Sequence, residues 1–228
     1  MLSKNSFIQI AGVKNLPEAQ MLVSSGVDYI GFPFRLVYHK EDLNEDEAAI
    51  IIQELPPATQ AVLITYLNKA KEIIELSRQL DVRIIQLHGD ISHSELRNLK
   101  SQHPELQIIK ILIIGKISEQ MMIKEMQTCA DWVDAFLLDT FDPVTGASGA
   151  TGKVHDWEIS RRLVEISNRP IILAGGLTPM NVGQAILTVR PAGVDVHTGV
   201  ENHNGNKDLQ RVKKFVSEAR EAFKVFAK

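Results

Sequence analysis

Two glycine-containing turns near the C-terminal end are the clearest chemical signal in this sequence. Gly175-Gly176 follows an apolar segment at 171–173, and Thr198-Gly199 follows a second one at 194–196. Glycine lets an anion approach the backbone N–H groups closely. Thr178-Pro179 is a suitable helix start, where unpaired N–H groups attract anions. The two turns together predict a phosphate site, although packing turns without a ligand would share the same pattern.

Two further residues with acid–base chemistry follow apolar segments. Asp139 comes directly after Leu137-Leu138, where burial would raise its pKa and suit it to general-acid catalysis. A helix cap or loop anchor is the alternative for this aspartate. His88, within Gln86-Leu87-His88-Gly89-Asp90, could bind a substrate or be a structural residue.

A regular series of strands and helices is needed to position these residues. Apolar segments alternate with amphipathic helical patterns along the whole chain. The expected strands are 7–10, 29–32, 61–64, 84–87, 107–113, 135–138, 171–173 and 194–196. The expected helices begin at Asn15, at Asn44, at Lys69, at Ser92 (with Glu95 completing a capping box), at Ser118, at Trp157, at Thr178 and near Asp208.

Eight strand–helix units with continuously apolar strands predict a (β/α)₈ TIM barrel, an α/β fold, with 1–228 as a single domain. An open doubly wound sheet is the alternative, but no G-x-G-x-x-G motif follows the first strand. In a barrel the chemistry lies where the strands end. The polar residues expected there are Gln9, Arg35, Thr65, His88, Asp90, Lys110, Asp139, Asp195, His197 and Thr198. The glycine-rich segment 146–153, in the loop expected after the sixth strand, is interpreted as a substrate-covering loop rather than a P-loop.

Composition excludes several other classes of protein. The net charge of −3 and the lack of a dense Lys/Arg run argue against a nucleic-acid partner. Cys129 is the single cysteine, which excludes an internal disulfide and a multi-cysteine metal site. No apolar run approaches the roughly 20 residues of a membrane helix, so no membrane partner and a cytoplasmic location are expected. The histidines, among them His39, His88, His155 and His197, show no metal-binding spacing, so no metal is predicted.

Several motifs, in order and spacing, resemble the phosphoribosylanthranilate isomerase family over essentially the whole chain. They are Q-L-H-G-D at 86–90, L-L-D-T at 137–140, G-A-T-G-K-V-H-D-W at 149–157, L-A-G-G-L-T-P-M-N-V at 173–182 and G-V-D-V-H-T-G-V-E at 193–201, followed by Lys207-Asp208.

The resemblance implies a (β/α)₈ enzyme of tryptophan biosynthesis that acts without a cofactor. It would convert an N-linked phosphoribosyl anthranilate, an aminoaldose, into its aminoketose by an Amadori rearrangement. Asp139 matches the family's general acid, which opens the ribose ring. Gly175, Gly176, Thr198 and Gly199 match the phosphate-binding turns, and Arg35, His88 and Asp195 are further candidates for substrate binding. The expected partner is a small phosphorylated anionic substrate, and the protein would be a monomer or a homodimer.

The chain departs from the family pattern at the expected base. The first strand normally reads K-I-C-G, and its cysteine removes the C2 proton; here Gln9-Ile10-Ala11-Gly12 stands in its place. The Ser-Pro-Arg motif after the second strand is absent, and the serine pair after the eighth strand has become His197-Thr198. Three interpretations remain open: an isomerase in which His197 or His39 replaces the base, an enzyme for another phosphorylated sugar or amine, and a non-catalytic phosphometabolite-binding protein.

Overall fold

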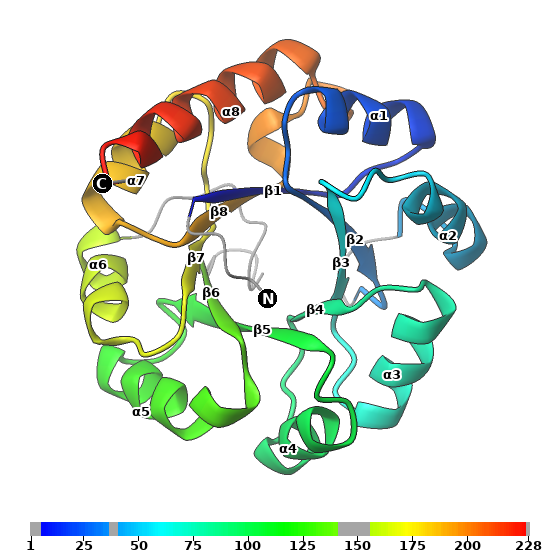
Figure 1. Ribbon diagram of the computed structural model, residues 1–228. Helices are drawn as coiled ribbons and strands as arrows, with labels where there is room; N and C mark the ends of the chain where they lie inside the picture. The colour runs from blue at the N-terminus through cyan, green and yellow to red at the C-terminus, as the bar shows by residue number, and fades with distance from the viewer. Residues whose placement is uncertain (1–5, 37–40, 141–155, 227–228) are drawn as a thin grey trace.

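The strands form one closed barrel in the computed structural model, which describes residues 6–36, 41–140 and 156–226. All neighbouring strands are parallel, and β1 pairs with β8 to close the ring (Figure 1). The strands are β1 (Phe7–Ala11), β2 (Tyr29–Phe34), β3 (Gln60–Thr65), β4 (Ile84–Leu87), β5 (Gln107–Ile114), β6 (Ala135–Thr140), β7 (Ile171–Leu173) and β8 (Gly193–Val196). The predicted (β/α)₈ barrel is confirmed.

Helices surround the barrel on its outer side (Figure 1). The α-helices are α1 (Leu16–Ser24), α2 (Glu45–Gln53), α3 (Ala70–Gln79), α4 (His93–Gln102), α5 (Glu119–Cys129), α6 (Trp157–Ile166), α7 (Val182–Val189) and α8 (Leu209–Lys224). Two short 3₁₀ helices are η1 (Ala130–Trp132) and η2 (Thr198–Val200). No helix in the described ranges is long and apolar enough to cross a membrane.

Two separate apolar clusters hold these layers together. The larger one lies between the strands and the helices and includes Ile8, Ile10 and Phe215. The smaller one fills the barrel interior with side chains such as Phe7, Ala11 and Ile111. Because side chains alternate along a strand, neighbouring residues of β1 belong to different clusters. Because of the same alternation, every second residue of a strand points toward the centre of the barrel, polar residues included.

Local sequence explains where most helices begin. The Asn15 side chain accepts from the N–H of Glu18, and Asn44 forms a complete capping box with Glu47. The box predicted for Ser92 and Glu95 forms only in part. Ser92 accepts from the N–H of Glu95, but the Glu95 carboxylate accepts from the N–H of Ala70 instead, which ties α3 to α4.

The predicted helix start at Thr178 is wrong, because α7 begins at Val182. Thr178 Oγ1 accepts from the N–H of Met180, which closes a turn rather than a helix. The Asn181 side chain then accepts from the N–H of Thr178 and donates to the Gly176 carbonyl. Side-chain bonding within the turn therefore delays the helix.

The sixth strand is longer than predicted. Asp139 and Thr140 pair with Ile113 and Ile114 of β5, so Asp139 lies in the strand and not in the following loop. The glycine-rich segment 146–153 and His39, in the loop after β2, lie outside the described residues.

Candidate active site

One cavity collects most of the predicted site residues at the carboxyl ends of the strands. Of the predicted site residues, all eight other than Arg35 line this cavity: His88, Asp139, Gly175, Gly176, Asp195, His197, Thr198 and Gly199. Ala11, Gln86 and Asp42 line it as well. Strands at opposite sides of the barrel therefore contribute to one site, as is general for this architecture.

The two glycine turns form one wall of the cavity. Gly175 and Gly176 have φ values of +84° and +63°, a region that favours glycine. A Cβ on Gly199 would lie 1.8 Å from the Leu177 carbonyl oxygen, so the turn after β8 packs directly against the turn after β7. Since the N–H groups of Thr178 and Met180 are already used inside the turn, the backbone at Gly175-Gly176 and the start of η2 are the surfaces left for an anion.

Asp139 lies at the end of β6 beside the first glycine turn. Its carboxylate is buried, and Oδ1 accepts a hydrogen bond from the N–H of Thr140 at 2.7 Å. A Cβ on Gly175 would lie 3.1 Å from this Oδ1 and 2.1 Å from the Thr140 hydroxyl. Asp139 is therefore close to any group held by the turn, a position that suits a general acid.

A buried polar layer crosses the barrel below this level. The Gln9 amide of β1 donates to the Gln86 oxygen of β4 at 2.7 Å, and the Gln86 amide donates to Nε2 of His88 at 2.9 Å. Gln86 was missed by sequence reasoning. The sequence feature that could have identified Gln86 is the alternation of side chains along β4, which places Gln86 and His88 on the same face of the strand.

Asp195 belongs to this layer and has an unusual environment. Its carboxyl is buried, and Oδ1 has no hydrogen-bond partner among the described residues. Burial, followed by the charge of Asp139, raises its pKa to about 7, although the amides of Gln86 and Gln9 and the charge of Lys207 oppose this rise. The group can therefore exist in either protonation state near neutral pH.

His88 is a neutral group in this cavity. Burial lowers its pKa to about 4, and its Nε2 is occupied as an acceptor by Gln86. A neutral imidazole cannot neutralise an anionic substrate, but its other ring nitrogen can donate a hydrogen bond. The ring also lies 5.5 Å from that of Tyr66, centroid to centroid, which positions it at the cavity wall.

His197 stands near the place of the missing thiol. A Cβ on Gly12, the residue after Ala11, would lie 2.1 Å from His197 Nε2, so the imidazole rests on the glycine backbone. The same nitrogen is 3.4 Å from a Glu201 carboxylate oxygen. Lys207 bonds that oxygen at 2.7 Å and the His197 carbonyl at 3.0 Å, and its burial lowers its pKa.

Arg35 lies apart from the other predicted residues. It adopts a left-handed backbone conformation with φ of +58°. Its guanidinium pairs with Glu45 and lies 3.6 Å from a Glu41 oxygen, and Arg35 does not line the cavity formed by the described residues. Its predicted role in substrate binding stays a prediction.

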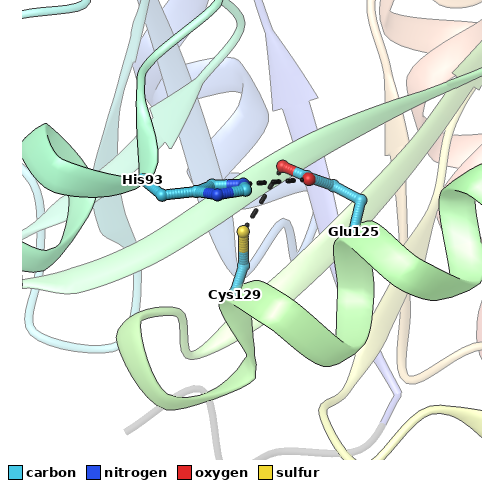
Figure 2. Close-up of side chains that lie close together, drawn as sticks. All are labelled: His93, Glu125 and Cys129. Carbon is cyan, nitrogen blue, oxygen red and sulfur yellow. Dashed lines mark hydrogen bonds and ion pairs between the residues drawn. The ribbon is translucent and has the colours of Figure 1, made fainter.

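A second cluster of titratable side chains lies outside this cavity, between α4 and α5 (Figure 2). Glu125 accepts from His93 at 3.0 Å and from the Cys129 thiol at 3.4 Å, and the possible ligand atoms lie within 4.8 Å of one another. The Lys110 ammonium is 3.6 Å from the same carboxylate and balances its charge. Burial raises the pKa of the Cys129 thiol to about 12. The Glu125 carboxylate is thus already paired with groups of the protein itself.

Comparison with known proteins gives a consistent result. Residues 8–218 match the family of N-(5'phosphoribosyl)anthranilate (PRA) isomerase. The N-(5'-phosphoribosyl)anthranilate isomerase 2 of Methanosarcina mazei is 39% identical over 218 residues, covering 95% of both chains. The corresponding isomerase of Trichlorobacter lovleyi is 36% identical and covers 94% of this chain and 98% of its own.

Solved structures show the same likeness. The phosphoribosyl anthranilate isomerase of Thermotoga maritima superposes with a TM-score of 0.80 at 30% identity, covering 94% of this chain and 98% of that one. A phosphoribosyl anthranilate isomerase in complex with reduced 1-(o-carboxyphenylamino)-1-deoxyribulose 5-phosphate superposes at 0.78 with 29% identity and the same coverage. The barrel, the strand-end cavity and these similarities agree, and the chain belongs to the phosphoribosylanthranilate isomerase family.

Proposed function

We propose that this protein isomerises N-(5'-phosphoribosyl)anthranilate in tryptophan biosynthesis, converting the aminoaldose into the aminoketose. The observation that carries this proposal is that Asp139 and both glycine turns line one cavity. Family membership supports the same activity. The protein would act in the cytoplasm, as a monomer or a homodimer and without a cofactor.

The phosphate of the substrate would lie against the glycine turns. Gly175, Gly176 and Gly199 present backbone without side chains, and Thr198 adds a hydroxyl at the start of η2. Backbone N–H groups at such positions bind phosphate without a counter-charge from a side chain. His88, Asp195 and Arg35 are the further contacts that we propose for the sugar and the anthranilate.

Asp139 would start the reaction as the general acid. Protonation of the ribose ring oxygen breaks the C1–O bond, and the nitrogen lone pair forms a protonated Schiff base at C1. Removal of the C2 proton then gives an enolamine, which becomes the aminoketose when C1 takes up a proton and the C2 hydroxyl gives one up. Ala11 cannot accept the C2 proton, so another group of the cavity must do so. His197 is the candidate from the sequence, and Glu201 at 3.4 Å would orient its ring.

The first prediction tests the general acid. Asp139→Asn removes the transferable proton but keeps the shape of the side chain, so kcat should fall about 10²–10⁴-fold. The measurement is aminoketose formation by the purified protein, followed chromatographically. Asp131→Asn, at an exposed position on η1, is the matched control and should retain the wild-type rate. A wild-type protein that forms no ketose above the buffer rate would refute the proposed activity.

Ala11 at the place of the expected thiol favours a second candidate: a related protein that acts on, or only binds, another phosphorylated sugar or amine. Thermal unfolding with a panel of phosphosugars separates the possibilities, because a ligand that binds only the folded state raises the melting temperature. Stabilisation by a different phosphosugar, with no turnover of the anthranilate compound, would favour this second candidate.

A further inference from the structure

The barrel positions the Asp195 carboxyl, which so far has no role in proton transfer, near the place where the thiol is missing. In the pairing of β1 with β8, Gln9 is opposite Asp195 and Ile10 is opposite Val196. Gln9 and Ala11 lie on the same inward face of β1, because side chains alternate along a strand. Asp195 is therefore one layer below Ala11 on the adjacent strand, and both line the cavity.

The Asp195 carboxyl forms no ion pair with the residues that the structure describes. None of the described ion pairs includes it, and Oδ1 accepts no hydrogen bond within the described part of the chain. The groups around it are the Gln9 amide on β1, the Gln86 amide on β4, Asp139 on β6 and Lys207 before α8. The Lys207 ammonium is already bonded to Glu201 and the His197 carbonyl. A buried carboxyl of this kind is an effective proton acceptor near neutral pH.

His197 is less well placed for this task. Its Nε2 faces Glu201 and the Gly12 backbone, and its side chain is 32% exposed. Asp195 is buried and lies in β8, two residues before His197 and deeper in the barrel, where water competes less for the proton.

We propose that Asp195 accepts the C2 proton of the Schiff base, in place of the thiol that Ala11 lacks. The C2–H bond breaks, and its electrons form the C1–C2 double bond. The C1–N double bond becomes single as nitrogen takes back its electron pair. The proton then resides on the Asp195 carboxyl. C1 next gains a proton and the C2 hydroxyl loses one, which turns the enolamine into the aminoketose, and Asp195 returns to its ionised state when it releases the proton taken from C2. This inference rests on the proposed isomerase function.

The key experiment combines loss and rescue. Asp195→Asn removes the acceptor with little change in shape, so kcat should fall about 10²–10⁴-fold. Adding Ala11→Cys to that variant places a thiol on β1 beside the same cavity and should recover at least tenfold. His197→Asn should lose less activity than Asp195→Asn. A larger loss in His197→Asn, or a loss in Asp195→Asn that Ala11→Cys does not recover, would overturn the assignment.

The pH profile of kcat/KM distinguishes a proton acceptor from a residue that only supports the structure, because only the pKa of the acceptor sets the acidic limb. Gln9→Lys introduces a cation in register with Asp195 and should lower its pKa. The acidic limb of kcat/KM should then shift by one pH unit or more toward acid. Gln60→Lys adds the same charge at an exposed position of β3 and should leave this limb in place. An unchanged limb in Gln9→Lys would contradict the proposal.

Direct titration separates this inference from the activity itself. The Asp195 carboxyl can be followed by ¹³C NMR in the free protein, with Asp195→Asn to assign the signal. A midpoint near 7, lowered in Asp139→Asn, is expected whether or not the anthranilate compound is turned over. A midpoint near 4 would overturn the role of Asp195, whereas the expected midpoint in a protein that forms no ketose would refute only the proposed activity.

Discussion

Two carboxyl groups share the cavity, and their immediate contacts differ. Asp139 Oδ1 accepts a hydrogen bond from the Thr140 N–H, whereas Asp195 Oδ1 accepts none within the described residues. The difference comes from single neighbours: Thr140 supplies the N–H to Asp139, and Gln9 brings an amide rather than a cation to Asp195.

The unusual pKa of Asp195 has a consequence for stability. Its pKa is raised from 3.8 to about 7 in the folded protein, so between these values the folded state holds a proton that the unfolded state has lost. Wild-type stability should therefore fall as pH rises from about 4 to 7, by roughly 4 kcal/mol from this group. Asp195→Asn lacks this dependence.

Urea unfolding at pH 5, 6, 7 and 8 measures the effect. The free energy of unfolding of Asp195→Asn relative to wild type should increase steadily up to about pH 7 and then level off. A difference that stays constant with pH would show that Asp195 has an ordinary pKa in the folded protein.

At the scale of elements, the β7 and β8 turns act as one unit. The Leu177 carbonyl is packed against Gly199, so neither turn can move without the other. The bonds among Thr178, Asn181 and Gly176 stiffen the first turn, and η2 shapes the second. This mutual packing gives a preformed surface for phosphate.

Gly199→Ala should therefore weaken anion binding. Its Cβ would meet backbone at 1.8 Å, which forces the turns apart and should cost about 1–3 kcal/mol of stability. The rise in melting temperature caused by inorganic phosphate should also shrink. Gly183→Ala in α7, where the nearest atom is 3.8 Å from the added Cβ, is the matched control and should keep the phosphate effect. Equal phosphate effects in both variants would count against the proposed phosphate site.

At the scale of the whole molecule, the C-terminal helix is joined to the first strands. Arg220 of α8 donates to the Ser6 and Gly26 carbonyls at 2.6 and 3.0 Å and to the Asp28 carboxylate at 2.6 Å. Asp28 in turn accepts from the N–H of Ile8 in β1. One side chain thus links α8 to the start of β1, and neither Arg220 nor Asp28 lines the cavity.

Arg220→Ala should lower the free energy of unfolding by about 1.5–3 kcal/mol, because it leaves a carboxylate and two carbonyls without their donor. Denaturant unfolding measures this loss, and the kcat of the folded protein should not change. Arg161→Ala removes an exposed arginine that pairs with Glu165, and should cost less than about 1 kcal/mol. Similar losses in the two variants would show that Arg220 contributes no more than a surface ion pair.

Much of this architecture could be predicted from the sequence, and the limits have physical reasons. Strand positions follow from local apolar patterns, so β4 and β7 were predicted with their observed bounds, and α6 with its observed start. Strand ends were less certain: β6 continues through Asp139 and Thr140 because β5 offers pairing partners for both. The start of α7 was wrong because a threonine followed by proline can open a helix or close a turn, and Asn181 decides between them.

The sequence by itself determined the barrel, the strand-end residues, the family resemblance and the absence of the expected thiol. Each of these depends on local pattern or on residue identity. Only the tertiary structure decided which groups meet across the barrel: Gln9 contacts Gln86, His197 contacts Gly12, and Asp195 Oδ1 has no hydrogen-bond partner among the described residues. The physical reason is that protonation depends on burial and on neighbours that are distant in sequence, and barrel closure alone brings β1, β4, β6 and β8 together.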